Sequence, residues 1–449
     1  MSKIKMHLAF DLSWTHLEGR WRMPGSWTGR VYPDIAMFKE IASIAERGCI
    51  DMLFFGDGTG IPSTWRGSQD EAVRWGIGWP RQDMSPYIAI LGQHTKHVGF
   101  GITYSSTFMH PFYVARLLNS LDHVTRGRMA FNIVTSTRRA DAANYGFDEL
   151  MEHNSRYDRM EEFVDVCKSL WASIEPDAFR WDRDSGIVVE DASKVRAINH
   201  AGAFFKVKGP LSCVPSPQGR PVLIQAGGSP RGIKASAHFA DYVFAANKSI
   251  KHNVAHREAL DAELRTKGRD PSQIGILWDI VAIVGETEAE AKRHKEQMLT
   301  AIPPEAAGAF ISHNVGYDFS KLPARFTLGG LNQEIAATNA SPVGFVHRMA
   351  LQYGADAEMT REEFFEHGMR YATAYDHAIA GSAAQVADFM EEEFEATGSR
   401  GGFMLAHPPS TPRDLLNVVD FLVPELQRRG RFRTEYDSTL LKDNLRIAA

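Results

Sequence analysis

The chain has only three cysteines among its 449 residues, Cys49, Cys167 and Cys213. Because they are few and widely separated, they form neither a disulfide framework nor the clustered ligand set of a zinc site. No His-Glu-x-x-His and no Gly-x-Ser-x-Gly sequence occurs, which leaves zinc proteolysis and serine hydrolysis without support. We therefore interpret the cysteines as core residues and expect no metal centre.

Long hydrophobic runs and an excess of positive charge are also absent. No run of about 18 apolar residues occurs, so we expect no membrane span. The net charge of -5 argues against a general nucleic-acid surface, which needs a basic excess. The segment from Met1 to Asp11 ends in an acid where a secretory signal would stay apolar, so we expect it to hold the first strand of a cytoplasmic protein.

Eight short apolar runs alternate with helical patterns along the chain. Most of them are continuously apolar, as is typical of parallel strands buried on both faces. The expected strands are 6–10, 52–55, 98–104, 129–135, 221–226, 242–245, 274–284 and 402–405. Eight strands alternating with helices predict an α/β fold, a (β/α)8 TIM barrel, with a doubly wound sheet as the alternative.

The chain is much longer than the roughly 250 residues of a typical barrel of this class, so it needs long insertions. Two stretches fit this description. Residues 59–87 are rich in Gly, Trp and Arg, and residues 303–373 contain much Gly and Asn and no obvious strand. Since no flexible linker separates these stretches from the rest, we predict one domain over residues 1–449 with two insertions.

The most informative segment runs from Phe131 to Trp171. Its strand ends in polar side chains, among them Asn132 and Thr135, and a loop rich in hydrogen-bonding groups follows. An amphipathic helix then begins near Arg156. In barrel enzymes the chemistry lies where strands pass into loops, so we expect this segment to form one wall of a site.

A glycine-rich turn follows the expected strand 221–226 and precedes a helix. Its sequence from Gln225 to Gly232 contains Gly228, Ser229 and Arg231. A strand, a glycine turn and a helix N-terminus together present backbone N–H groups to an anion, and Arg231 could add a charged contact. The turn is neither a P-loop nor a complete dinucleotide fingerprint, so a phosphate site and a plain capped turn both stay open.

Four further positions are candidates for ligand contact, each with a structural alternative. His153 and Tyr157 are spaced to share one helix face, although a solvated helix end would look the same. Asp57 and Thr103 follow or end expected strands, where they could equally form a turn or satisfy backbone groups. His16 follows the first strand and is a candidate proton donor or substrate contact, or a structural histidine.

Together these segments resemble the nitrilotriacetate/dibenzothiophene-sulfone monooxygenase group of the bacterial luciferase-like flavin monooxygenases. The motifs that carry the resemblance are Asn132–Ser136, Ala143–Gly146, Arg156–Phe163, Leu170-Trp171, Leu121–His123 with Gly127-Arg128, Gln225–Ser229 and Val423–Gly430. Two departures concern the substrate side. Arg400-Gly401-Gly402-Phe403 stands where the group usually has Asp-Gly-Phe. Near the first strand, where the group often has a Gly-His pair, this chain has Thr15-His16 with a shifted neighbourhood.

The resemblance implies an FMNH2-dependent two-component monooxygenase, which oxygenates a small organic substrate with O2 through a peroxyflavin. It implies reduced FMN supplied by a separate NAD(P)H:flavin reductase, and a homodimer or homotetramer. Ser229, Gly228 and Tyr157 would lie near the phosphate, and Asp57 and Thr103 near the ring and ribityl chain. The full set of implied pocket residues is Asp57, Thr103, Asn132, Thr135, His153, Tyr157, Gly228 and Ser229.

Two other functions stay open at this point: a deazaflavin-dependent oxidoreductase of the same fold, and a non-catalytic flavin-binding protein. The substrate is not specified by the sequence. Arg66, Arg74 and Trp75 in the first insertion either face an anionic or aromatic substrate or belong to a solvated loop. Phe326 and Leu328 in the second insertion are equally ambiguous.

Overall fold

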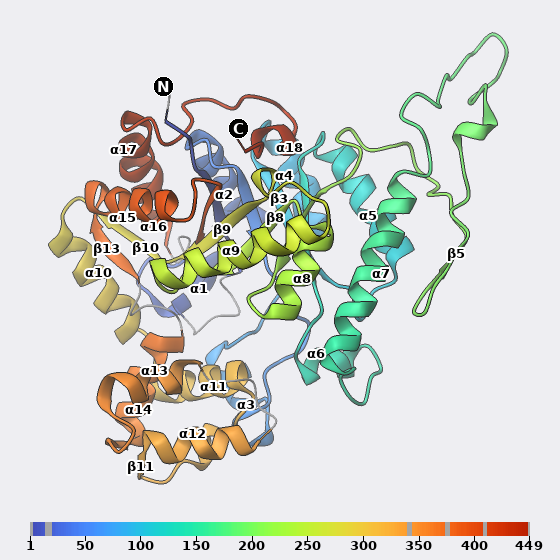
Figure 1. Ribbon diagram of the computed structural model, residues 1–449. Helices are drawn as coiled ribbons and strands as arrows, with labels where there is room; N and C mark the ends of the chain where they lie inside the picture. The colour runs from blue at the N-terminus through green and yellow to red at the C-terminus, as the bar shows by residue number, and fades with distance from the viewer. Residues whose placement is uncertain (1–2, 14–19, 339–343, 373–377, 407–410, 448–449) are drawn as a thin grey trace.

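Eight parallel strands close into a barrel that is surrounded by helices in the computed structural model (Figure 1). The structure describes residues 3–13, 20–338, 344–372, 378–406 and 411–447. The barrel strands are β1 (His7–Asp11), β2 (Met52–Phe55), β3 (Gly99–Ser105), β4 (Met129–Val134), β7 (Val222–Ala226), β8 (Tyr242–Ala246), β9 (Gly275–Ile280) and β14 (Gly401–Ala406). The predicted TIM barrel is confirmed, and all eight expected strands are present.

One expected strand is in fact two. The run 274–284 divides into β9, which belongs to the barrel, and β10 (Ala282–Gly285), which leaves it. β10 pairs in parallel with β13 (Ile379–Ser382) to form a separate two-stranded sheet. Since the run from Ile280 to Val284 is apolar on both sides of the division, the sequence carries no signal at the point where the chain leaves the barrel.

The outer helices follow the strands with the expected ends. Thr287 caps α10 (Glu288–Thr300) through its side chain, and the helix that follows Thr411 is continuous through a π-helical turn over residues 418–422. The helices around the barrel are α1 (Thr28–Val31), α2 (Ile35–Arg47), α4 (Ser85–His94), α5 (Pro111–Val124), α6 (Arg139–Asn144), α7 (His153–Trp171), α8 (Pro230–Phe239), α9 (Ile250–Thr266), α10 (Glu288–Thr300), α15 (Ala383–Ala396), α16 (Pro412–Asn417), α17 (Val423–Arg428) and α18 (Leu441–Asn444).

The two glycines at the start of β14 are required by the closeness of neighbouring strands. A Cβ on Gly402 would lie 1.9 Å from the carbonyl oxygen of His7, and one on Gly401 would lie 2.1 Å from that of Ile276. Gly401 also has a φ of +103°, which other residues rarely adopt. Arg400, just before them, donates to Asp261 on α9. The departure from the family sequence at this point therefore lies at the N-terminal end of β14, where the strand begins.

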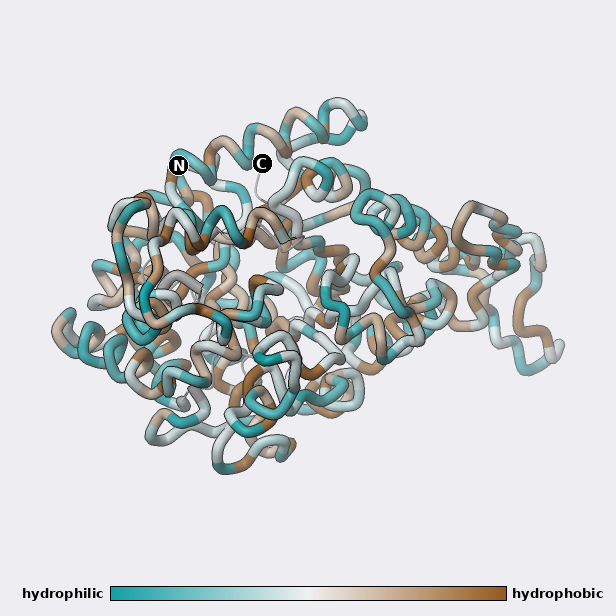
Figure 2. The backbone as a smooth tube through the Cα atoms, turned by 90° about the horizontal axis from the view of Figure 1, so that it is seen from below, coloured by the Kyte–Doolittle hydropathy of each residue, from teal (hydrophilic) through white to brown (hydrophobic). Residues whose placement is uncertain are grey.

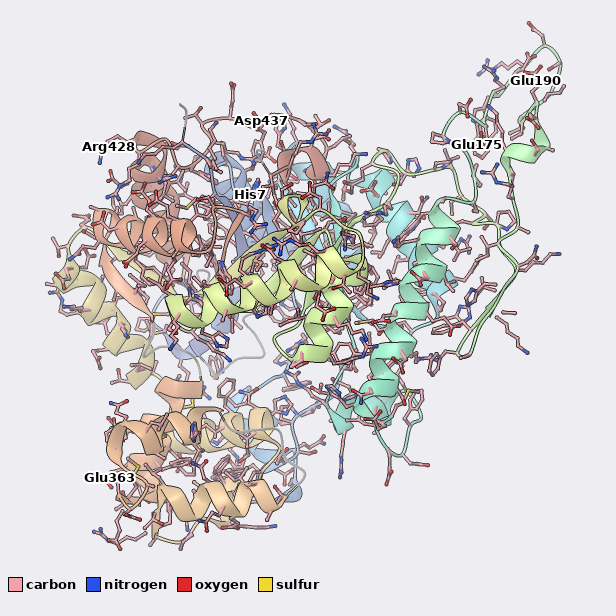
Figure 3. All side chains as sticks on the ribbon, in the orientation of Figure 1. His7, Glu175, Glu190, Glu363, Arg428 and Asp437 are labelled. Atoms are coloured by element: carbon pink, nitrogen blue, oxygen red, sulfur yellow. The ribbon has the colours of Figure 1, made fainter. Side chains whose placement is uncertain are left out.

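The N-terminal end of the barrel is closed by the C-terminal part of the chain. Asp51, 1% exposed, accepts a hydrogen bond from the backbone N–H of Leu8 (2.8 Å) and lies 3.2 Å from His7 Nδ1 and 2.7 Å from Arg433 Nη2. The Tyr242 hydroxyl donates to the carbonyl of Leu445, just after α18. Figure 3 shows His7 and Asp437 on this side of the molecule.

The two predicted insertions pack on each other at the opposite side of the molecule. The first contributes α3 (Asp70–Trp75), and the second contributes α11 (Pro304–Val315), α12 (Leu328–Ala337), α13 (Gly344–Tyr353) and α14 (Arg361–Ala372), with the short antiparallel pair β11 (Arg325–Thr327) and β12 (Glu358–Thr360). The expectation of no strand in 303–373 was therefore wrong, because three-residue strands leave no periodic signal. Trp65 packs tightly against Gly308 of α11, so the insertions share one core.

A third insertion, residues 172–221, was not predicted. It leaves the barrel between α7 and β7 as an arm that stands away from the body in Figure 1 and again in Figure 2, with Glu175 and Glu190 marking it in Figure 3. Its only regular pairing among the described residues is β5 (His200–Ala201) with β6 (Lys206–Val207). None of the described helices combines the length and the apolarity needed to cross a membrane.

Candidate active site

The predicted site residues converge at the C-terminal ends of the barrel strands. A cavity of about 580 Å³ opens there. It lies beside a smaller recess that Asp57, Thr103 and Ser136 line together. The cavity lining includes Asp57, Gly58, Thr59, Ile61, Trp79, Arg81, Asp83, Tyr104, Met109, Asn144 and Tyr145. A larger cavity of about 820 Å³ beside α10 and α16 contains none of the predicted site residues.

Thr103 and Asn132 lie side by side on neighbouring strands of the barrel. They are register partners in β3 and β4, and Asn132 Nδ2 donates to Thr103 Oγ1 at 3.0 Å. Both are almost fully buried, at 4% and 3% exposure. Asn132 Oδ1 has no hydrogen-bond partner within the described part of the chain. A buried acceptor without a donor is rare in native proteins, so this oxygen is a candidate ligand contact.

The chain after Thr135 turns sharply. Ser136 has a φ of +49°, an uncommon conformation for a residue with a side chain that often marks functional sites. The Thr135 carbonyl accepts from Thr107 Oγ1 at 2.6 Å, and the Ser136 carbonyl accepts from Arg156 Nη1 at 2.6 Å. These bonds connect the end of β4 to the beginning of α7, where Tyr157 follows directly.

Asp57 stands after β2 at the entrance of the cavity. Its side chain is 31% exposed, and Oδ1 accepts from the Gly58 N–H at 2.8 Å. Removal from bulk water raises the pKa of this carboxyl, although Arg81, at 3.9 Å, opposes the change. The structure therefore brings Asp57 to the recess that Thr103 also lines.

The glycine-rich turn forms a cradle at the start of α8. Ser229 is the helix cap, its Oγ accepting from the Gly232 N–H at 3.1 Å. A Cβ placed on Gly232 would lie 3.2 Å from both Ser229 Oγ and the Tyr157 hydroxyl, so these two hydroxyls are neighbours. The space beside Gly228 is open. A helix N-terminus with two hydroxyl donors has the chemistry of an anion site.

His153 and Tyr157 share one face of α7, as their spacing predicted. Their ring centroids are 5.2 Å apart, and His153 is exposed at the first turn of the helix. Arg231, in contrast, does not serve the cradle: it pairs with Asp158 at 2.7 Å and with Glu161 at 2.6 Å. The expectation that Arg231 adds a phosphate contact is wrong, because two carboxylates already hold its guanidinium.

Several other sequence candidates lie elsewhere or cannot be placed. His16 falls outside the described residues. Arg74 pairs with Glu71, and the Trp75 indole donates to the same carboxylate. Arg66 lies over the Trp65 ring. These three side chains therefore make their contacts within the first insertion. Phe326 and Leu328 belong to the core that the insertions share.

Three charged residues at this end of the barrel were not predicted. Arg81 and Arg138 both approach Gly58: a Cβ there would lie 3.0 Å from Arg81 Nη1 and 2.7 Å from Arg138 Nη1. Burial lowers the pKa of Arg81 to about 10, with Arg138 adding to the shift. The only sequence signal was that Arg138 follows the strand-end motif closely. Arg81 lies within an insertion that has no periodicity to read.

Asp279 is the third residue. It is placed two positions beyond Leu277 on β9, and therefore on the same inward side, with Oδ1 buried and without a partner among the described residues. Burial raises its pKa to about 8, and Asp11 at the end of β1 adds to the increase. Among the described residues, no group of three or more His, Cys, Asp or Glu could hold a metal ion.

Comparison with known proteins gives concordant matches over almost the whole chain. The sequence model described as luciferase-like monooxygenase matches residues 11–401. Dibenzothiophene-sulfone monooxygenase of Rhodococcus erythropolis (strain XP) is 33% identical, covering 98% of this chain and 96% of the relative. Nitrilotriacetate monooxygenase component A of Aminobacter aminovorans is also 33% identical, covering 99% and 97%. A riboflavin lyase (RcaE) solved with modified FMN and riboflavin superposes with a TM-score of 0.86 at 26% identity, covering 98% and 95%.

Proposed function

Because the chain belongs to the luciferase-like monooxygenase family and is a flavin-dependent monooxygenase, we propose that it is the oxygenase component of a two-component system and takes FMN in the reduced form. The observation that supports this most directly is the Ser229–Tyr157 cradle at the start of α8. It offers two hydroxyl donors and a helix N-terminus at one place, which suits a phosphate group better than an uncharged ligand.

The other residues also fit a flavin. Asn132 Oδ1 is a buried acceptor in need of a donor, and a flavin carries an N–H and ribityl hydroxyls that can supply one. Two of these residues, Thr103 and Asp57, line the recess. Thr135 directly precedes Ser136, which also lines it. We assign Ser229, Gly228, Tyr157 and His153 to the phosphate end, and Asp57, Thr103, Asn132 and Thr135 to the ring and ribityl end.

Bound reduced FMN would supply the electrons that activate O2. The chain itself would hold the flavin, exclude water and place a proton. The two packed insertions cover this end of the barrel, which limits access of water to the cavity. The raised pKa of Asp279 keeps its carboxyl largely protonated at neutral pH, so it presents an O–H at the barrel mouth. His16 stays a candidate proton donor.

The partners that we propose follow from the family. They are a small organic substrate, O2 and a separate NAD(P)H:flavin reductase, and the chain would act as a homodimer or homotetramer. We also propose that residues 1–449 work as one catalytic domain, because the first insertion lines the same cavity as the barrel strands and shares a core with the second.

Anaerobic titration with reduced FMN, riboflavin and a deazaflavin tests this proposal. We expect tight binding of reduced FMN, weaker binding of riboflavin by at least about tenfold because it lacks the phosphate, and no preference for the deazaflavin. Admission of O2 in the presence of a substrate panel should then give an oxygenated product. Tight binding of the deazaflavin alone would favour the hydride-transfer alternative, and flavin binding without turnover would favour the non-catalytic one.

A further inference from the structure

We propose that the substrate is a small organic anion, a carboxylate or a group of similar charge and shape, held by Arg81, which lines the 580 Å³ cavity, and by Arg138, which approaches the cavity-lining Gly58. This inference rests on the proposed function for what happens to the substrate, but the binding site stands on its own geometry. Two guanidinium groups and one cavity define it.

The two arginines come from different segments and meet at one point. Arg81 belongs to the first insertion, and Arg138 immediately precedes α6. Both Nη1 atoms lie within about 3 Å of the position of a Cβ on Gly58, which itself lines the cavity. Any larger residue at Gly58 would fill the space between them. The absence of a side chain at Gly58 therefore leaves room beside both guanidinium groups.

Neither guanidinium is neutralised by a close ion pair. Nε and Nη2 of Arg81 are buried without a hydrogen-bond partner, and the Arg138 side chain makes no hydrogen bond or ion pair within the described part of the chain. Arg81 is only 11% exposed. A buried guanidinium with unpaired N–H groups is costly, so the position of Arg81 is favourable only when an anion occupies the site for part of the catalytic cycle.

The carboxylates nearby do not take this role. Asp141 Oδ1 accepts from the backbone N–H groups of Thr59 and Gly60, at 2.8 and 2.7 Å. Asp57 comes no closer to Arg81 than 3.9 Å, and Asp83 accepts from the N–H of Ser85. These acids reduce the positive potential, but among the described residues none of them accepts a hydrogen bond from either guanidinium group.

His313 of α11 completes the surroundings without adding charge. Burial lowers its pKa to about 3, with Arg138 and then Arg81 contributing, so the imidazole stays neutral. The positive charge of the site therefore comes from the arginines. Besides its polar side chains, the cavity lining includes the apolar and aromatic residues Ile61, Trp79, Met109 and Tyr145. A ligand with one negatively charged group and an organic remainder matches this combination.

The cofactor phosphate is the other possible source of the anion. The phosphate cradle is built by the β7–α8 turn and α7, whereas the arginines stand beside Gly58, after β2. Flavin phosphate at the cradle leaves the arginines for a second anion. The experiment below separates the two sources.

Calorimetric titration with matched pairs of ligands tests the proposal. The probes are butanoate, octanoate, benzoate and phenylacetate, each beside its primary amide, added to the FMN-loaded protein. We expect at least one carboxylate to bind about tenfold more tightly than its amide, because a charge-assisted bidentate contact is lost in the amide. Arg138→Gln and Arg81→Gln should each remove most of this preference and leave amide binding unchanged.

Arg139→Gln is the matched control, since Arg139 is the exposed neighbour of Arg138 on α6. It should keep the preference for the carboxylate. A panel in which no carboxylate exceeds its amide overturns the proposal, as does an Arg139→Gln variant that behaves like Arg138→Gln. If Arg81→Gln does not fold, Arg138→Gln, at a half-buried position, decides alone.

A second arm compares FMN with riboflavin. If Arg138→Gln loses the preference for FMN, the arginines serve the cofactor phosphate and the substrate proposal falls. If the wild-type protein binds no flavin, the proposed function fails, while the ratio of carboxylate to amide binding still reports on the anion site by itself.

Discussion

Two clusters of buried polar groups, one at each end of the barrel, differ in how far their members are paired. At the N-terminal end, Asp51 is surrounded by His7, the Leu8 N–H and Arg433, and only Arg433 Nη1 is without a partner among the described groups of that cluster. At the C-terminal end, Asn132 Oδ1, Asp279 Oδ1 and two nitrogens of Arg81 are all buried and unpaired.

The difference separates stability from function. Buried polar groups that satisfy one another stabilise the fold, and their removal leaves an uncompensated charge. Buried polar groups without partners stabilise nothing in the free protein, so their presence at a cavity indicates a ligand. Mutations at the closed end should therefore change unfolding, and mutations at the open end should change binding.

The largest expected effect is at the closed end. Asp51→Asn leaves Arg433 buried without its carboxylate, which should reduce the free energy of unfolding by about 3–5 kcal/mol. Burial alone would raise the pKa of Asp51, but Arg433 and His7 outweigh it, so the pKa is lowered. A depressed carboxyl pKa contributes stability above its unfolded value of about 3.9, and that stability is lost as the pH falls.

Urea unfolding of the wild type and of Asp51→Asn measures this effect at pH 7 and at about pH 3, below the unfolded pKa. The difference between them should shrink at the lower pH. Asp437→Asn, an exposed acid on the same side of the molecule, is the control and should change little. If Asp51→Asn and the wild type were equally stable at pH 7, the paired groups around Asp51 would not stabilise the fold, and the contrast between the two clusters would fail.

Ser229→Ala tests the phosphate cradle at the open end. Loss of a hydrogen bond to a charged group should weaken FMN by about 1.5–3 kcal/mol, roughly tenfold to a hundredfold, with riboflavin unaffected. The same change removes a helix cap, at a cost of about 1 kcal/mol in stability. Ser249→Ala removes the corresponding cap of α9 and should lower stability without changing the FMN:riboflavin ratio, measured by flavin fluorescence.

The barrel itself could be predicted because its strands are buried on both faces. Continuous apolar runs such as Met52–Phe55 and Tyr242–Ala246 identify parallel strands. The glycine-rich turn follows the fifth strand of the barrel in chain order, β7. The arm 172–221 was missed because it has little periodic structure, and β10 because its departure from the barrel changes no hydrophobic pattern.

Residues of the candidate site could be predicted only where their position at the end of a strand places them there. Asp57, Thr103 and Asn132 stand at or near strand ends, and the barrel brings such ends together. Arg81 and Asp279 could not be found in this way, because the lack of a partner is a property of the folded molecule. Arg231 shows the converse: its place beside the glycine turn suggested a ligand contact, but α7 supplies acids that the local sequence does not reveal.

Asp279→Asn should reverse the pH trend of Asp51. The folded pKa of about 8 lies above the unfolded value of about 3.9, so the native state holds an extra proton between them. Stability is therefore full below pH 4 and declines as the pH rises towards 8. At pH 8.5 we expect the variant, which has no charge to bury, to exceed the wild type by a few kcal/mol, because the wild type must ionise a buried carboxyl that has no donor among the described residues. Urea unfolding between pH 5 and pH 8.5 measures this, and an unchanged slope in the variant would show that Asp279 is not a buried acid.

The smallest expected change in stability is that of Asn132→Leu, which also sharpens the comparison most. The substitution removes one neutral hydrogen bond to Thr103 and, at the same time, an acceptor that had no partner, so the net cost should stay below about 1 kcal/mol. Asn253→Leu is the matched control, because both polar groups of Asn253 are paired, with Glu393 and with the Lys248 N–H, and its loss should cost about 1–3 kcal/mol. Flavin affinity should respond in the opposite order, falling several-fold in Asn132→Leu and staying unchanged in Asn253→Leu. Parallel urea and flavin titrations of the two variants measure both the stability and the flavin affinity. A large loss of stability with normal flavin binding in Asn132→Leu would show that Asn132 stabilises the barrel and does not contact the flavin.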